Sequence, residues 1–189
     1  RFLFDFMARD LRMAGRGYCA AADDCESDRW PLDGTDLEPP LVFDAGALTI
    51  RYESFDADGD PIFVEAVYEL NGNEVEYSRR TNDVLDGSGR FALPDVDAGY
   101  SGEPLVAGVS DDPDNPGLIF EFGVYDRTND TYDYVDSITA GNVDDISAIR
   151  TTVTFVDLQP WAGQAITVGD QGAISFTVAL RNRVARVTQ

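Results

Sequence analysis

Alternation of apolar and polar residues with a period of two constrains the fold of this chain more than any other feature. It runs through 48–53 and 62–70, and it resumes at Val75 after the dipeptide Asn71-Gly72. Because successive side chains of a strand point to opposite faces, each of these segments predicts a strand with one buried face. The Asn-Gly dipeptide between two of them predicts a β-hairpin.

The same alternation returns in the second half of the chain. The segments that carry it are 118–125, 131–135, 146–158 and 173–181, and 104–107 begins another ordered segment before them. Short polar turns separate several of them, and successive hairpins imply antiparallel pairing. We therefore expect residues 48–189 to form a β-rich head.

Residues 1–14 carry a helical pattern instead. Leu3, Met7 and Leu11 recur every four residues, with charged residues between them. Glycine at position 15 is a common way to end such a helix. Together with the strands, this segment predicts an α+β fold in which one N-terminal helix packs on antiparallel sheet.

The start of this helix carries no capping residue before Phe2, and the apolar pattern is already running there. The simplest account is that 1–17 is the C-terminal part of a longer helix. Residues 18–47 then read as an irregular connection, because they hold several acids and the helix-disfavouring pair Pro39-Pro40. We expect Trp30 to anchor this connection to the core.

Two cysteines, Cys19 and Cys25, lie close together in the connection. The intervening residues suffice to close a small disulfide loop, which an envelope or extracellular location would favour. Two free thiols are the alternative, and a metal-binding pair is less favoured.

The charge of the chain excludes several classes of function. The net charge is -21, and all of the basic residues are arginine. Such a chain is unsuited to binding a nucleic-acid backbone or an anionic membrane surface. Abundant aspartate without lysine resembles proteins of salt-loving organisms, although a GC-rich genome would also favour arginine codons.

Histidine is absent from the sequence, which removes the usual general base at neutral pH and the commonest metal ligand. No histidine-dependent triad can therefore form. We expect a protein without enzymatic activity, and a carboxylate-dependent glycosidase is an alternative that no motif supports.

Asp56, Asp58 and Asp60 stand at alternate positions in a short acidic segment. Calcium takes oxygen ligands with such spacing, so this segment is a candidate calcium site. The glycine and glutamate positions of an EF-hand loop are not matched, and an acidic hairpin turn explains the same residues. No other cofactor is expected.

The run Phe6-Met7-Ala8-Arg9-Asp10-Leu11-Arg12-Met13-Ala14-Gly15 resembles the segment that follows the membrane helix in PilW-type minor type IV pilins. Later blocks resemble that family in their order along the chain. These blocks are Ile50-Arg51-Tyr52-Glu53, Val67-Tyr68-Glu69-Leu70, Pro104-Leu105-Val106-Ala107, Ile146-Ser147-Ala148-Ile149-Arg150 and Leu180-Arg181-Asn182-Arg183.

The resemblance implies the pilin-like α+β fold and a role in starting pilus assembly. Partners would be other minor pilins, the major pilin and a PilY-type tip adhesin. The subunit would be anchored in the inner membrane by an upstream helix with its head in the periplasm, and would become extracellular in the pilus. A type II secretion pseudopilin and a calcium-dependent adhesive module are the alternatives.

The apolar residues near the start of the helix have two interpretations under this resemblance. Phe2, Leu3, Phe6 and Met7 either pack on the sheet of the head or face neighbouring subunits. The sequence leaves the choice open for each of them.

Overall fold

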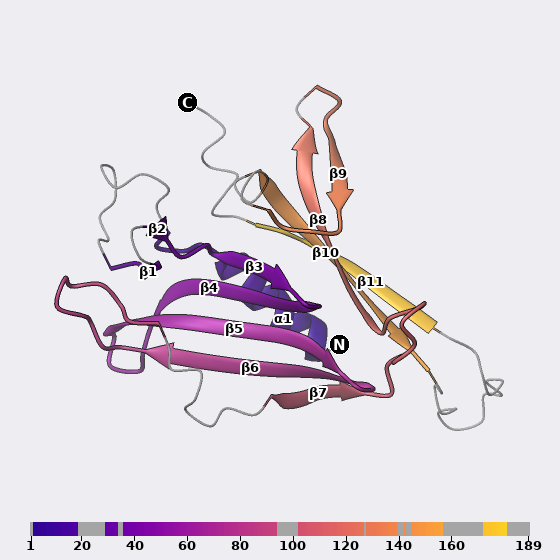
Figure 1. Ribbon diagram of the computed structural model, residues 1–189, viewed down its shortest axis with the longest axis horizontal. Coiled ribbons are helices and arrows are strands. Elements are labelled where there is room, and N and C mark those ends of the chain that lie inside the picture. The colour runs from indigo at the N-terminus through magenta and orange to yellow at the C-terminus, as the bar shows by residue number, and fades with distance from the viewer. Residues whose placement is uncertain are drawn as a thin grey trace.

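The computed structural model describes residues 2–18, 29–33, 36–93, 102–126, 128–139, 142, 145–156 and 172–180. Within these ranges the chain forms antiparallel β-structure around one helix (Figure 1). The elements in chain order are α1 (Phe2–Met13), β1 (Leu32–Asp33), β2 (Asp36–Leu37), β3 (Leu41–Asp44), β4 (Ala47–Phe55), β5 (Pro61–Asn71), β6 (Glu74–Asn82), β7 (Glu103–Ala107), β8 (Leu118–Asp126), β9 (Thr131–Val135), β10 (Ile146–Phe155) and β11 (Gly172–Ala179).

The longer strands form two sheets. One has the order β3-β4-β5-β6-β7, so each strand pairs with its neighbours in sequence, and the other has the order β11-β10-β8-β9. Every named strand pairing is antiparallel, as the hairpin signals predicted. The predicted Asn71-Gly72 hairpin is confirmed as the β5–β6 connection, where Gly72 has a positive φ of 58°.

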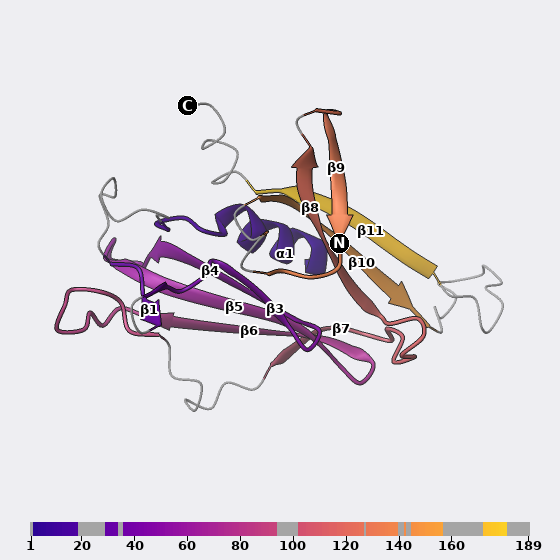
Figure 2. The ribbon, with the colours of Figure 1, turned by 45° about the horizontal axis from the view of Figure 1, so that its top comes forward.

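The helix lies between the two sheets (Figure 2). Phe4 meets Phe176 of β11 edge to face, with ring centres 4.8 Å apart. Where the sheets contact each other directly, Phe43 of β3 packs against Phe120 and Phe122 of β8. The main core therefore combines the inner faces of both sheets with one stripe of the helix. Among the described residues, no helix is long and apolar enough to cross a membrane.

The predicted pilin-like α+β fold class is wrong. The described residues are mostly strand, and α1 has only 12 residues. The prediction placed the C-terminal half of a longer helix on one face of antiparallel β-structure. In the structure a second sheet closes over the other side of α1, so the fold is β-rich, with the helix filling the space between the sheets.

The connection predicted to be irregular contains strands. β3 is the edge of the five-stranded sheet and pairs with β4, so this sheet begins at Leu41 and not at residue 48. The sequence prediction missed β3 because its four residues Leu41–Asp44 are too short for alternation to be recognised. Ile174, an apolar residue in the predicted strand 173–181, is 49% exposed on β11.

A second, smaller core lies on the outer face of the five-stranded sheet, which is the face turned away from α1. Trp30, Phe63 and Phe91 are buried there, with Tyr18 packed against them. The Trp30 ring stands perpendicular to that of Phe63, with centres 5.2 Å apart. Trp30 thus anchors its segment as expected, but to this outer core.

We expect Phe63→Ala to lower the free energy of unfolding by about 3–5 kcal/mol, because it empties the outer core. Phe55→Ala is the matched control. Phe63 has no exposed surface, whereas Phe55 is 58% exposed and has the Arg16 guanidinium 5.4 Å from its ring centre. The control should cost less than about 1 kcal/mol. Equal losses in urea unfolding, followed by tryptophan fluorescence, would contradict this assignment.

Candidate functional site

Asp10 lies in α1 and has no exposed surface, although it is a charged residue. Its carboxylate accepts hydrogen bonds from three tyrosine hydroxyls of the five-stranded sheet. Tyr52 donates to Oδ1 at 2.9 Å, and Tyr68 and Tyr77 donate to Oδ2 at 2.8 and 3.2 Å. We call these four residues the Asp10 cluster.

The strand register brings the three tyrosines to one place. They come from β4, β5 and β6, which are consecutive strands of the sheet. The two-residue period turns each of them toward the helix. Tyr68 and Tyr77 stand directly opposite each other across β5 and β6, with ring centres 4.9 Å apart. Their hydroxyls therefore reach the same carboxylate oxygen.

The cluster satisfies a group that would otherwise destabilise the fold. An unpaired buried carboxylate costs several kcal/mol, because it loses its hydration. Here the Arg9 guanidinium adds contacts from Nε and Nη2 to Oδ1, both at 3.3 Å. Asp10 therefore fixes the position of α1 against three strands at once.

The same contacts hold the tyrosines in their protonated form. Burial, with the nearby Asp10 charge as a further cause, raises the pKa of Tyr52 to about 12. The pKa values of Tyr68 and Tyr77 are also raised, first by burial and then by Asp10. At neutral pH these hydroxyls act as hydrogen-bond donors and are poorly suited to acid–base catalysis.

A groove of about 490 Å³ adjoins the cluster. We call it the arginine groove, and its lining residues are Phe6, Arg9, Met13, Tyr52, Ser54, Tyr77 and Arg79. The Arg9 side chain is 57% exposed, and its guanidinium lies 4.8 Å from the centre of the Phe6 ring. The groove therefore combines aromatic walls with cationic groups in a strongly acidic protein.

Arg79 enters the groove from β6. Its guanidinium lies close enough to the Tyr52 hydroxyl to lower the pKa of that tyrosine, against the larger effects of burial and Asp10. Its Nε is buried and has no hydrogen-bond partner within the described part of the chain. Guanidinium groups that lie against aromatic rings bind carboxylates and other compact anions. The groove is therefore suited to binding such an anion.

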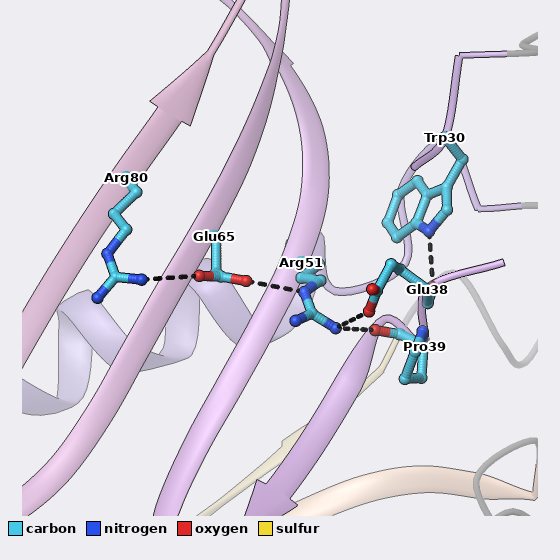
Figure 3. Close-up of polar contacts among 6 residues, drawn as sticks. All are labelled: Trp30, Glu38, Pro39, Arg51, Glu65 and Arg80. Carbon is cyan, nitrogen blue, oxygen red and sulfur yellow. Dashed lines mark hydrogen bonds and ion pairs between the residues drawn. The ribbon is translucent and has the colours of Figure 1, made fainter. Parts of the chain in front are cut away.

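Ion pairs on the outer face of the five-stranded sheet form a second polar cluster (Figure 3). Glu65 of β5 lies opposite both Arg51 of β4 and Arg80 of β6. The Arg51 guanidinium donates to Glu65 at 2.9 Å and to Glu38 at 2.8 Å, and Arg80 reaches Glu65 at 3.4 Å.

This cluster has a structural explanation. Arg51 also donates to the Pro39 carbonyl, and the Trp30 indole donates to the Glu38 carbonyl at 2.7 Å. The ion pairs thus attach the described residues around Glu38 to the sheet. The charges are mutually paired, and we assign no binding role to the cluster.

The three aspartates of the predicted calcium site lie in the β4–β5 turn. The Asp56 carboxylate accepts hydrogen bonds from the backbone N–H groups of Asp58 and Asp60, both at 2.9 Å. Within the described ranges, no group of three or more acidic or cysteine side chains could hold a metal ion. The geometry therefore favours the hairpin-turn interpretation and gives calcium no support.

The other predicted site residues are divided between core and groove. Leu3 and Met7 belong to the main core, whereas Phe6 is half-buried and lines the arginine groove, with its ring edge to face with that of Tyr77 at 5.3 Å. The side chain of Phe2 and both predicted disulfide residues, Cys19 and Cys25, lie outside the described residues.

The Asp10 cluster was missed from sequence, although a signal was present. Asp10 stands three residues after Met7 and four before Ala14, so it falls on the apolar stripe of the helix. A charge on that stripe must find buried donors. Tyr52, Tyr68 and Tyr77 are aromatic residues with a hydroxyl at inward strand positions, but sequence alone does not bring them to the same helix residue.

Comparison with known proteins gives no family for this chain. No protein-family model matches the sequence, and no curated protein matches it either.

We expect Asp10→Asn to lower the free energy of unfolding by about 2–4 kcal/mol, because the amide loses charge-assisted bonds and turns a donor toward donors. Asp133→Asn, an exposed change on β9, is the matched control and should stay within about 0.5 kcal/mol. Urea unfolding measures both. A loss no larger for Asp10 than for Asp133 would show that the cluster does not hold the helix.

Alkaline pH should weaken the fold through the three tyrosines. Their pKa values are raised in the folded state, that of Tyr52 from 10.0 to about 12, so above about pH 10 the unfolded chain releases protons that the folded chain retains. Stability is full below pH 10 and lost as the pH rises toward 12, by up to about 1.4 kcal/mol per pH unit for each tyrosine.

Urea unfolding at a series of alkaline pH values measures this loss, and the absence of lysine removes the other common titration in that range. Tyr52→Phe should give a shallower decline, because it removes one titrating hydroxyl. Stability that does not change between about pH 9 and pH 11 would refute the prediction.

Proposed function

We propose that this chain is a non-enzymatic assembly subunit of the minor type IV pilin kind, which takes part in starting pilus assembly at the tip. It acts through surfaces and not through a catalytic pocket. Its partners are other minor pilins, the major pilin and a PilY-type adhesin. Its location follows from the role, with an anchor in the inner membrane, a head in the periplasm and a final place in the extracellular pilus.

The observation that carries the proposal is the burial of Asp10. The helix run from Phe6 to Gly15 is the segment with the specific resemblance to minor pilins. Asp10, in the middle of that run, is the residue that joins the helix to three strands. A subunit that packs into an assembly through its helix needs such a joint, because forces on the helix must reach the head.

The end of the helix supports the same role. Gly15 has a positive φ of 71°, and its N–H donates to the Arg51 carbonyl at 2.9 Å. The Arg16 carbonyl accepts a hydrogen bond from the Glu53 N–H at 2.8 Å. The backbone is therefore hydrogen-bonded to β4 directly after the helix ends. The helix is therefore held at its middle and at its end.

The fold class departs from the one that the resemblance implied, and the proposed role does not require that class. The helix segment, its attachment to the sheet and the acidic, histidine-free composition support the role. Of the alternatives, a secretion pseudopilin would use the same joint, whereas a calcium-dependent module has no group of ligands in the described part of the chain.

Deletion of the encoding gene in the source organism tests the role. We expect the deletion strain to lose surface pili, seen by electron microscopy and in sheared surface protein, and the wild-type gene to restore them. The Asp10→Asn gene should restore fewer pili, and Asp133→Asn should restore them fully. Normal pili with defective protein secretion would indicate that the chain is a secretion pseudopilin instead. Normal pili with normal secretion would overturn the proposal.

A further inference from the structure

We infer that the arginine groove binds a carboxylate side chain, flanked by an apolar side chain, on a segment of a different protein. The side chains of the groove supply the chemistry that recognises a carboxylate. That the segment belongs to a fellow assembly subunit rests on the proposed function.

Arg79 has no carboxylate counter-charge among the residues that line this groove. Among the ion pairs of the described residues, Arg79 has no carboxylate partner, whereas Arg51 has two and Arg80 and Arg150 have one each. The Asp10 carboxylate lies nearby, but it is already occupied by the tyrosine hydroxyls and by Arg9. A half-buried guanidinium without a counter-charge favours the arrival of an anion.

Arg9 is placed to contact the same anion. Its guanidinium stacks on the Phe6 ring at the edge of the groove, and most of its side chain is open to solvent. The groove thus holds two guanidinium groups against one buried carboxylate. The local charge is positive, in contrast with the net charge of -21.

The walls of the groove determine what accompanies the carboxylate. Phe6 and Met13 come from the helix, and Tyr52 and Tyr77 come from the sheet, so an apolar side chain can pack between them. A volume of about 490 Å³ lies in the range of sites that hold a small molecule or a few side chains. A single carboxylate beside a leucine or phenylalanine suits this space.

Charge argues for a different protein as the source of the segment. A second copy of this chain would bring together two surfaces that each carry a net charge of -21, and their repulsion opposes self-association. A highly charged polyanion is opposed by the same field. A segment with one carboxylate is repelled least and still meets both arginines.

Two blocked peptides test the inference on the purified protein, acetyl-Leu-Glu-Phe-amide and its glutamine counterpart. We expect the glutamate peptide to shift NMR signals of the groove residues and to bind at least about 10-fold more tightly than the glutamine peptide, as loss of a charge-assisted contact implies. Equal affinities, absence of binding at millimolar concentration, or shifts confined to other residues would overturn it.

Variants of the protein locate the site. Arg79→Gln should weaken binding of the glutamate peptide about 10-fold or more. Arg12→Gln removes the same charge at an exposed position of α1, outside the groove, and should leave the affinity unchanged. Ser54→Trp fills the groove without altering either arginine, and it should abolish binding even if Arg79→Gln does not fold. Unchanged binding by Ser54→Trp would refute the site.

Sedimentation of the wild-type protein without peptide checks the identity of the occupant. We expect a monomer, and a dimer that dissociates in Arg79→Gln would overturn the choice of a different protein. The peptide experiments need no pilus, so the two proposals fail separately. Peptide binding with normal pili after gene deletion would overturn the proposed function alone, and loss of pili without peptide binding would overturn the groove alone.

Discussion

The requirement of a buried carboxylate for hydrogen-bond donors organises the centre of this protein. Asp10 loses its water in the core, so donors must come from the protein. They come from three adjacent strands, and this fixes the rotation of α1 and its height above the five-stranded sheet. The arginine groove is a result of the same constraint, because Tyr52 and Tyr77 serve both as donors to Asp10 and as walls of the groove.

Buried carboxylates have different kinds of partner on the two faces of the five-stranded sheet. On the inner face the Asp10 carboxylate accepts its shorter hydrogen bonds from three neutral hydroxyls, and Arg9 adds charged contacts at 3.3 Å. On the outer face Glu65 is satisfied by full charges, because Arg51 and Arg80 lie directly opposite on the neighbouring strands. The positive and negative charges of the outer cluster are therefore paired with one another. On the inner face, Arg79 has no acidic partner among the described residues.

Local sequence patterns predicted most of the elements, because the physics of those elements is local. Alternation predicted β4, β5 and β8, and the Asn71-Gly72 dipeptide predicted the β5–β6 hairpin. The fold class was wrong because the partner of each face is a long-range property. Nothing in the pattern of β10 or β11 says that their sheet covers the free side of the helix. The candidate site was missed for the same reason, since Asp10 and its three donors are far apart in sequence.

The Asp10 cluster also sets an order of events in folding. Asp10 and Tyr77 are 67 residues apart, and the donors are assembled only when β4, β5 and β6 have paired. Until then the carboxylate keeps its water, and docking of the helix would bury a charge without partners. The N-terminal helix must therefore wait for a meander that emerges later from the ribosome. Closing so long a loop slows the final step, and the apolar stripe of the helix stays exposed while it waits.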